Sequence, residues 1–137
     1  MLAVRLHCPV LSFAVLVCTF GCGGQDPNRG EVSGIVTING QPAATGAVAF
    51  SPVDGQSPTS GGKIVDGKYT VKASTGTSRV AIRVPKVVGQ RKLYNTPDSP
   101  VQPLMEETLP AEYNDRTTLT LEVKPGANEH NFELTTK

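Results

Sequence analysis

The sequence predicts an all-β protein, with a single seven-stranded antiparallel β-sandwich after an N-terminal signal peptide. Three observations support this class. Short runs of β-branched residues alternate with polar ones at a period of about two, which is typical of half-buried strands. Turn dipeptides such as Asn39-Gly40 and Asp66-Gly67 separate these runs. The 14 glycines and 11 prolines, with no tryptophan, suit many short strands better than a helical bundle.

Residues 1–21 have the layout of a secretory signal peptide. Arg5 gives a positive start, and an apolar run from about Val10 to Phe20 precedes several glycines. That run is shorter than the roughly 20 apolar residues that a membrane-spanning helix needs. A buried core helix is the alternative, but Pro9 and the glycines that flank the run leave little helix to bury.

Cys22 is the predicted site of lipid attachment. The letters "TFGC" that end at Cys22 resemble a bacterial lipobox, in which a small residue precedes a cysteine that is acylated, for example with palmitate. Cys18 fits less well because a β-branched valine precedes it, and Cys8 lies too close to the start. An incidental Cys22 in a signal peptide cut elsewhere is the alternative. Several acyl chains would anchor the protein stably to a membrane. The glycine that follows favours the outer membrane over the periplasmic face of the cell membrane.

The rest of the chain is long enough for one domain, and its basic and acidic residues are balanced. After cleavage, residues 22–30 form a polar, glycine-rich tether, and residues 31–137 form the domain. Arg5 is the one charged side chain that is lost, so 12 basic residues face 12 acidic ones. A nucleic-acid-binding protein would show a basic excess, so we expect no nucleic-acid partner.

Seven strands are expected, at residues 31–38, 45–52, 59–65, 68–73, 78–85, 117–123 and 131–134. The fifth has the clearest alternation, with Val80 and Ile82 facing one way and Arg79 and Arg83 the other. The third is weakened by two glycines. The last two are expected to form a closing hairpin around Pro125-Gly126.

A long loop is expected at about residues 86–112. This stretch holds four prolines and shows no sustained periodicity. Loops of this length are uncommon inside compact domains and tend to be functional or disordered.

The apolar positions of the expected strands predict one core. Its candidates are Val32, Val36, Ile38, Val48, Phe50, Tyr69, Val71, Val80, Ile82, Val84, Leu119, Leu121, Val123, Phe132 and Leu134. Each such burial contributes about 1.5–3 kcal/mol, which makes a fold of this size without disulfides plausible.

The stretch "VSGIVTINGQPAATGAVAFSP" from Val32 to Pro52 resembles the opening of carboxypeptidase regulatory-like domains, which are transthyretin-like, immunoglobulin-like β-sandwiches. "DGKYTV" resembles the repeated turn and aromatic strand of that family. "LPAEYNDRTTLTLEV" and "NFEL" resemble small lipoproteins of planctomycete-type bacteria, in which such a domain follows a lipobox. The resemblance covers nearly all of the mature chain and implies a non-catalytic stability or interaction module.

Catalytic and metal sites lack the usual parts in the mature chain. It holds one histidine, His130, and its one cysteine is expected to be acylated, so neither a zinc site nor a Cys-His nucleophile can be assembled. Glu106-Glu107 suggests half of a carboxylate pair, but a solvated loop is the better interpretation. The aspartates lack calcium-loop spacing and are interpreted as turn formers. We therefore expect no enzyme, no metal and no cofactor.

Two features are candidates for binding. Tyr113 in "PAEYND" either docks the long loop onto the sandwich, which is the favoured interpretation, or touches a ligand. A basic set on and near the fifth strand suits an anionic surface polymer or lipid headgroups, although a solubilising charged face explains it as well. Its members are Lys72, Arg79, Arg83, Lys86, Arg91 and Lys92.

The sequence thus favours a non-enzymatic, membrane-anchored lipoprotein of the cell envelope that acts as a structural or interaction module. Its expected partners are the membrane, through the lipid, and an envelope protein or polysaccharide. The alternative is a binding protein for an envelope polysaccharide or small ligand, which would use the 86–112 loop and the basic strand face. The sequence names neither the ligand nor the oligomeric state.

Overall fold

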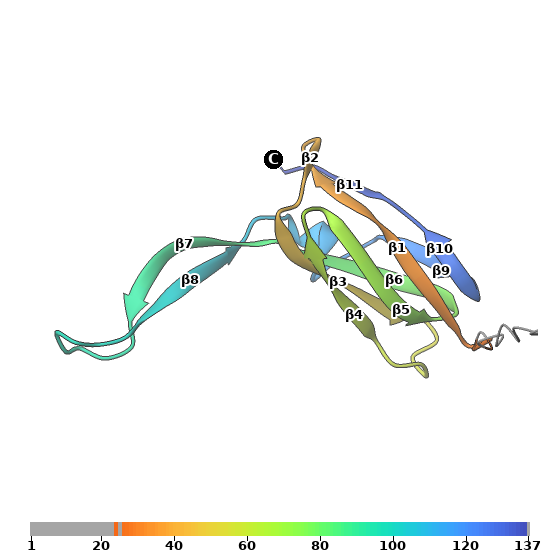
Figure 1. Ribbon diagram of the computed structural model, residues 1–137, viewed down its shortest axis with the longest axis horizontal. Helices are drawn as coiled ribbons and strands as arrows, with labels where there is room; N and C mark the ends of the chain where they lie inside the picture. Colours follow the sequence, from red (N-terminus) through yellow and green to blue (C-terminus); the bar gives the residue numbers. More distant parts are fainter. Residues whose placement is uncertain (1–23, 25, 137) are drawn as a thin grey trace, which may run out of the picture.

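A computed structural model describes residue 24 and residues 26–136, and this part of the chain is all-β, as predicted. The predicted signal peptide and Cys22 lie outside the described residues. One large curled sheet forms what we call the body, residues 29–84 and 108–136, and a two-stranded hairpin projects from it (Figure 1). We call this hairpin, residues 85–107, the arm. In the described part of the chain, no helix is long and apolar enough to cross a membrane.

The body sheet holds nine strands where seven are predicted. They are β1 (Arg29–Ile38), β2 (Gln41–Pro42), β3 (Thr45–Pro52), β4 (Ser60–Val65), β5 (Lys68–Ser74), β6 (Gly76–Arg83), β9 (Thr120–Val123), β10 (Gly126–Glu129) and β11 (Phe132–Leu134). Their order is β10-β1-β5-β4-β3-β6-β9, and β2 and β11 also pair with β1. Strands β4 and β5 pair only near their turn, at Val65 and Lys68, and there the sheet bends around its core (Figure 1).

The predicted closing hairpin is wrong. Strand β9 pairs with β6, whereas β10 and β11 lie parallel to β1 at the other end of the sheet order. The turn at Pro125-Gly126 therefore carries the chain from one end of the sheet order to the other. The alternation of residues 131–134 correctly predicted which side chains of this strand are buried. Alternation does not, however, indicate which strand pairs with it.

Strand β1 lies near one end of the sheet order and pairs along both of its edges. One edge is antiparallel to β5, and the other is parallel first to β10 and then to β11. Between β10 and β11 the chain crosses so close to Gly34 that a Cβ atom there would lie 1.8 Å from the His130 carbonyl oxygen. The Asn131 side chain accepts a hydrogen bond from the Ile35 N–H at 2.9 Å, which fixes the crossing. Residue 34 must therefore be a glycine, because a side chain there would clash with the backbone that passes it.

The core of the body contains every residue predicted for it, eleven of them buried and four partly buried. The partly buried ones are Ile38, Val84, Leu119 and Leu121. Residues missed by the prediction are Ala43, Ile64, Ala73 and Leu109. Tyr69 lies between Phe50 and Phe132, with ring centroids at 6.4 and 5.9 Å, and its hydroxyl donates to the His130 carbonyl oxygen at 2.7 Å.

The turns confirm the interpretation of Asn39, Asp54 and Asp66 as turn formers. Asn39 and Asp66 adopt positive φ angles of 52° and 50°, each followed by a glycine with positive φ. The Asp54 carboxylate accepts hydrogen bonds from the Gln56 and Ser57 N–H groups, which lowers the pKa of this carboxyl.

The segment expected as a long irregular loop is largely a hairpin. Strands β7 (Pro85–Lys92) and β8 (Val101–Glu107) pair antiparallel, with a bulge between Val87 and Gly89. The prediction failed because nearly every residue of the arm is exposed, so no buried face imposes an alternation on the sequence. Two of its prolines lie in the turn between the strands, and Pro103 lies in a strand that has one free edge, where proline is tolerated.

Candidate functional site: the arm and its root

The arm is the part of the described chain that leaves most apolar surface uncovered. Seven of the ten exposed large hydrophobic residues belong to it, and the other three are Ile35, Val53 and Val65 on the body. The seven are Val87, Val88, Leu93, Tyr94, Val101, Leu104 and Met105. Exposed apolar groups gathered on one element commonly mark an interaction surface.

Register divides the arm into two unlike faces, because residues opposite each other on antiparallel strands point the same way. Val87 pairs with Met105, and beyond the bulge Lys92 pairs with Val101. Alternation along β8 places Val101, Pro103 and Met105 on one face, which we call the apolar face. The opposite face carries the Lys86–Glu106 pair and the Arg91–Gln102 pair, the latter joined by a 3.4 Å hydrogen bond. The same register also places Gln90 and Lys92 on the apolar face and Leu104 on the opposite face, so the two faces differ only in degree.

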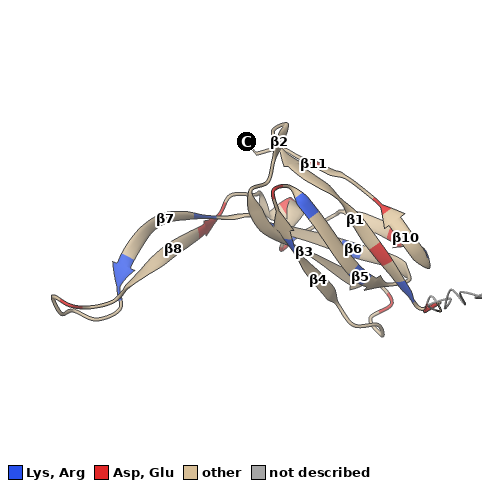
Figure 2. Cartoon of the chain, in the orientation of Figure 1, with Lys and Arg blue, Asp and Glu red and all other residues tan. Residues whose placement is uncertain are grey.

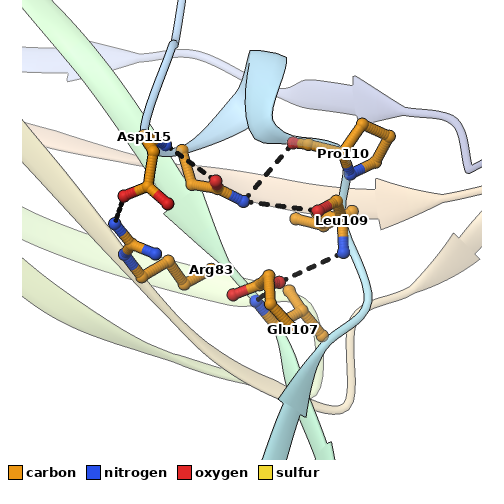
Figure 3. Close-up of polar contacts among 7 residues, drawn as sticks. Arg83, Glu107, Leu109, Pro110 and Asp115 are labelled. Atoms are coloured by element: carbon orange, nitrogen blue, oxygen red, sulfur yellow. Dashed lines mark hydrogen bonds and ion pairs between the residues drawn. The ribbon is translucent and has the colours of Figure 1, made fainter.

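Glu107 joins the arm to the body (Figure 3). Its Oε1 atom accepts hydrogen bonds from the N–H groups of Val84, at 2.9 Å, and Leu109, at 3.1 Å. Thr108 adds a 2.7 Å hydrogen bond from its hydroxyl to the Val84 carbonyl oxygen. These contacts hold the strand that enters the arm against the strand that leaves it at the root of the arm.

The segment after the root packs onto the body through η1 (Ala111–Tyr113). Leu109 is buried in the core, and the Asn114 side chain donates to the carbonyl oxygens of Leu109 and Pro110 (Figure 3). Tyr113 packs against the core, and its hydroxyl lies 3.4 Å from that of Thr135. These contacts agree with a docking role for Tyr113.

An open cavity of about 390 Å³ lies where the apolar face meets the body. We call it the notch. The arm contributes Pro85, Lys86, Val87 and Met105, and the body contributes Ala44, Thr45, Val84 and Thr108. Its walls are mostly apolar, so it is suited to an apolar or aromatic side chain.

The tip of the arm, residues 93–100, is an ordered turn. The Leu93 N–H donates to the Pro100 carbonyl oxygen at 3.0 Å, and the Tyr94 N–H donates to the Ser99 hydroxyl at 2.8 Å. These bonds hold Leu93 and Tyr94 in place while their side chains stay 49% and 66% exposed. The tip thus presents two large side chains on a backbone that is already ordered.

The predicted basic set is divided between body and arm (Figure 2). Arg79 and Arg83 lie exposed on the outer face of β6, as predicted, whereas Lys86, Arg91 and Lys92 lie on β7. Lys72 lies on β5 and pairs in register with Glu31. Arg83 Nη2 donates to Asp115 Oδ1, and this hydrogen bond, with the negative charge behind it, raises the pKa of the guanidinium. Arg83 is therefore already engaged within the chain.

Chemistry-bearing groups are sparse in the described part of the chain. Residues 24 and 26–136 hold no cluster of three or more His, Cys, Asp or Glu side chains placed to bind a metal ion. His130 packs edge-on against Phe132, with ring centroids 4.6 Å apart. A second open cavity, of about 570 Å³, lies beside the start of β1 and is lined by charged residues that include Asp26, Arg29 and Lys72.

Comparison with known proteins assigns no family. No protein-family model matches the chain, and no curated protein matches it. Among solved structures, the chain is similar to the crystal structure of a 9R-lipoxygenase from Cyanothece PCC8801, with 11% identity and a TM-score of 0.29. The alignment covers 80% of this chain and 16% of the lipoxygenase chain. A likeness this slight relates neither the fold nor the activity of the two proteins.

Proposed function

We propose that this chain is a non-enzymatic interaction module of the cell envelope, anchored to a membrane through acylated Cys22, and that it contacts its partner with the arm. The observation that carries the proposal is the gathering of exposed apolar side chains on the arm, an element with a fixed root and an ordered tip. Large exposed side chains on a preordered backbone lose little conformational entropy when they bind.

A transthyretin-like sandwich, as in carboxypeptidase regulatory-like domains, is the proposed fold of the body. In support, the sheet bends at β4 and β5 around a single core, and the Asn39-Gly40 turn follows the first strand. The projecting arm lies outside that pattern. It is an addition to the body, and additions of this kind commonly carry function.

The position of the arm suits an anchored protein. The start of β1 and the tip of the arm lie at opposite ends of the molecule (Figure 1). An anchor on the N-terminal side of β1 would therefore leave the arm directed away from the membrane that holds it. Cys22→Ala should release the protein from the detergent phase, and Cys18→Ala should leave it there. An unmodified N-terminus beyond residue 22, found by mass spectrometry, would remove the anchor from the proposal.

Shortening the arm tests the proposed function directly. Replacing residues 90–103 by a short glycine turn removes the tip and Val101, three of the arm's seven exposed large hydrophobic residues in all, but keeps Glu107 and the root contacts. We expect the body to fold with an unchanged circular dichroism spectrum, because loop length enters closure entropy only weakly. Partners captured by cross-linking in intact cells should be lost. Unchanged capture would show that the body faces, and not the arm, bind the partner.

A glycan array separates this proposal from the alternative of a polysaccharide-binding protein. Specific glycan binding that is weakened by Arg79→Ala, and by shortening the arm, would favour the alternative. Arg79 is the suitable residue because Arg83 is held by Asp115.

A further inference from the structure

We propose that Asn39 is a site of spontaneous deamidation, and that the contact of its side chain with residues 134–136 determines how fast this reaction runs. The site lies in the turn between β1 and β2, so the inference is independent of the arm and goes beyond the proposed function. Its consequence is a covalent difference between bodies in which β11 stays paired with β1 and bodies in which it opens.

Asn39 and Gly40 are the pair of residues that this reaction needs. Of the asparagines in the sequence, only Asn39 is followed by glycine. The Gly40 nitrogen attacks the Asn39 Cγ atom, and a five-membered succinimide ring closes. Glycine favours this attack because it has no side chain to obstruct the approach. Both residues are exposed, and a Cβ atom built at Gly40 would meet no described atom within 4 Å.

The reaction balances with water as its one co-reactant. As the ring closes, the Gly40 nitrogen loses its proton and the side-chain amide leaves as ammonia. Water then breaks one of the two carbonyl bonds to the ring nitrogen. Breaking the bond from Cγ leaves an aspartate at position 39. Breaking the other leaves an isoaspartate, in which the main chain runs through Cβ and Cγ. One water is consumed, one ammonia is released, and nothing is oxidised or reduced.

Three hydrogen bonds hold Asn39 against the end of β11, and we call them the latch. The Asn39 N–H donates to the Leu134 carbonyl oxygen at 2.8 Å. The side chain donates from Nδ2 to Thr136 Oγ1 at 2.7 Å, and its Oδ1 accepts from the Thr136 N–H at 3.0 Å. One residue, 97 positions further along the chain, thus engages both polar atoms of the amide. Figure 1 shows the turn before β2 beside the end of β11.

The latch opposes ring closure because it holds the side chain away from the peptide group that must attack it. The ring brings Cγ to bonding distance of the Gly40 nitrogen, which requires a Cα–Cβ rotamer far from a staggered one. Attack also needs the two reacting atoms close and aligned. The side chain must therefore leave Thr136 before it can react. Loss of two hydrogen bonds reduces the reactive population about tenfold or more.

The two products differ in how much of the latch they keep. An aspartate keeps the backbone N–H and offers two oxygens, which accept from the N–H and the hydroxyl of Thr136. An isoaspartate adds a carbon atom to the main chain inside a two-residue turn. The Ile38–Gln41 pairing and the hydrogen bond to Leu134 then cannot both be kept. The isoaspartate product therefore loosens the pairing of β1 with β11.

The test follows the conversion of Asn39 by peptide mass spectrometry while the full chain is incubated in detergent at mildly alkaline pH. The same chain unfolded in guanidinium chloride gives the rate without the latch. We expect the folded chain to convert about tenfold more slowly or less, because the side chain must first be released by a local opening. Asn39→Asp should release no ammonia from this site and should keep the stability of the parent chain.

Two neighbouring threonines provide a matched pair of variants. Thr136→Ala removes one of the two side-chain bonds and should raise the rate by a factor of about 2–10. Thr136→Pro removes the N–H donor as well and should raise the rate about tenfold or more. Thr135→Ala is the control, because Thr135 contacts Tyr113 and not Asn39, and it should leave the rate unchanged. Circular dichroism checks that each variant is folded.

Three results would overturn the inference. They are conversion of the folded parent as fast as the unfolded chain, equal rates for folded Thr136→Pro and Thr135→Ala, and an unfolded chain in which Asn39 stays intact. Hydrogen exchange checks the consequence. The isoaspartate fraction should exchange faster at Phe132 and Leu134 than the parent, and Asn39→Asp should exchange as the parent does. Equal exchange in all three would refute the loosening of β11.

Discussion

The body and the arm both contain antiparallel pairs of strands, but they differ in what covers the strands. In the body, alternate residues of each strand enter one core, and side chains such as Val32, Phe50 and Ile82 are fully buried. In the arm, register still defines two faces, but neither is covered within the described chain. The same backbone geometry thus gives a covered layer in the body and an uncovered one in the arm. The difference in stability between the two comes from the hydrophobic core that covers the strands of the body, rather than from the hydrogen bonds between strands.

A pair of glycine substitutions should separate the two regions most sharply. Gly34→Ala in the body would place a Cβ atom 1.8 Å from the His130 carbonyl oxygen, so β1 and the β10–β11 crossing must move apart. We expect a loss of more than about 4 kcal/mol in the free energy of unfolding, or no folded protein. Gly89→Ala in the arm meets the Leu104 Cδ1 atom at 3.7 Å, an ordinary contact, and should change stability by less than about 0.5 kcal/mol. Urea unfolding of both variants checks the contrast.

Large-to-small substitutions should give the next largest difference. Ile82→Ala removes a fully buried side chain and should cost about 2–5 kcal/mol. Met105→Ala removes one that is 55% exposed and should change stability by less than about 0.5 kcal/mol. Arg83→Ala removes an exposed ion pair with Asp115 and should cost about 0.2–1 kcal/mol. Equal effects at Ile82 and Met105 would show that the arm packs in the monomer as the core does.

Alkaline pH should act on the body through Tyr69. Burial raises the pKa of its phenol above the ordinary value of about 10. Below that value the phenol is protonated in both states. As the pH rises above it, the unfolded chain releases its proton first, so the free energy of unfolding falls. Tyr69→Phe should reduce this slope, and at neutral pH it should cost about 0.5–1.5 kcal/mol for the lost hydrogen bond to His130.

Tyr94→Phe is the control for the same titration. Tyr94 is 66% exposed at the tip of the arm, so Tyr94→Phe makes the same substitution without removing a buried phenol. Unfolding by urea at pH 8, 9, 10 and 11 measures the slope for the three proteins. An equal slope for the parent chain and for Tyr69→Phe would contradict the assignment to Tyr69.

A small effect of the opposite sign is expected at Ser78 in the body. Its side chain is fully buried, and in the described structure its hydroxyl has no hydrogen-bond partner. Burying an unpaired hydroxyl is unfavourable, whereas the smaller alanine leaves little space behind. Ser78→Ala should therefore be neutral or raise the free energy of unfolding by up to about 1 kcal/mol. A clear loss of stability, measured by thermal unfolding, would show that the hydroxyl has a partner in solution, such as a buried water.

Sequence patterns predicted the body far better than the arm, for a physical reason. Apolar and charged residues such as Ile82 and Arg83 alternate along β6 because one face of this strand is buried. The buried face could therefore be predicted directly from the sequence. Ile64 was missed because Gly61 and Gly62 interrupt the pattern of its strand. The arm has no buried face to impose a pattern, and its prolines suggested a loop.

The candidate site was harder to predict because it depends on distant contacts. Arg79 and Arg83 are exposed, and Tyr113 packs against the core, whereas their roles in binding stay predictions. The notch, however, brings Ala44 together with Met105, and Glu107 binds the backbone of Val84. Two adjacent glutamates such as Glu106 and Glu107 look alike in the sequence. Only the structure shows that the Glu106 carboxylate faces solvent while the Glu107 carboxylate binds backbone N–H groups at the root of the arm.

The parallel pairing of β1 with β10 and β11 also determines when the body can be completed. Val36 pairs with Phe132, and Ile38 pairs with Leu134. The pairing of the first strand therefore cannot be completed until the last strand has been synthesised. At a synthesis rate of about 5–20 residues per second, roughly 5–20 s separate the two on the ribosome. Contacts this distant along the chain also form slowly once both partners are present. During that interval one edge of β1 lies open to chaperones, and the body closes only when β10 and β11 have emerged.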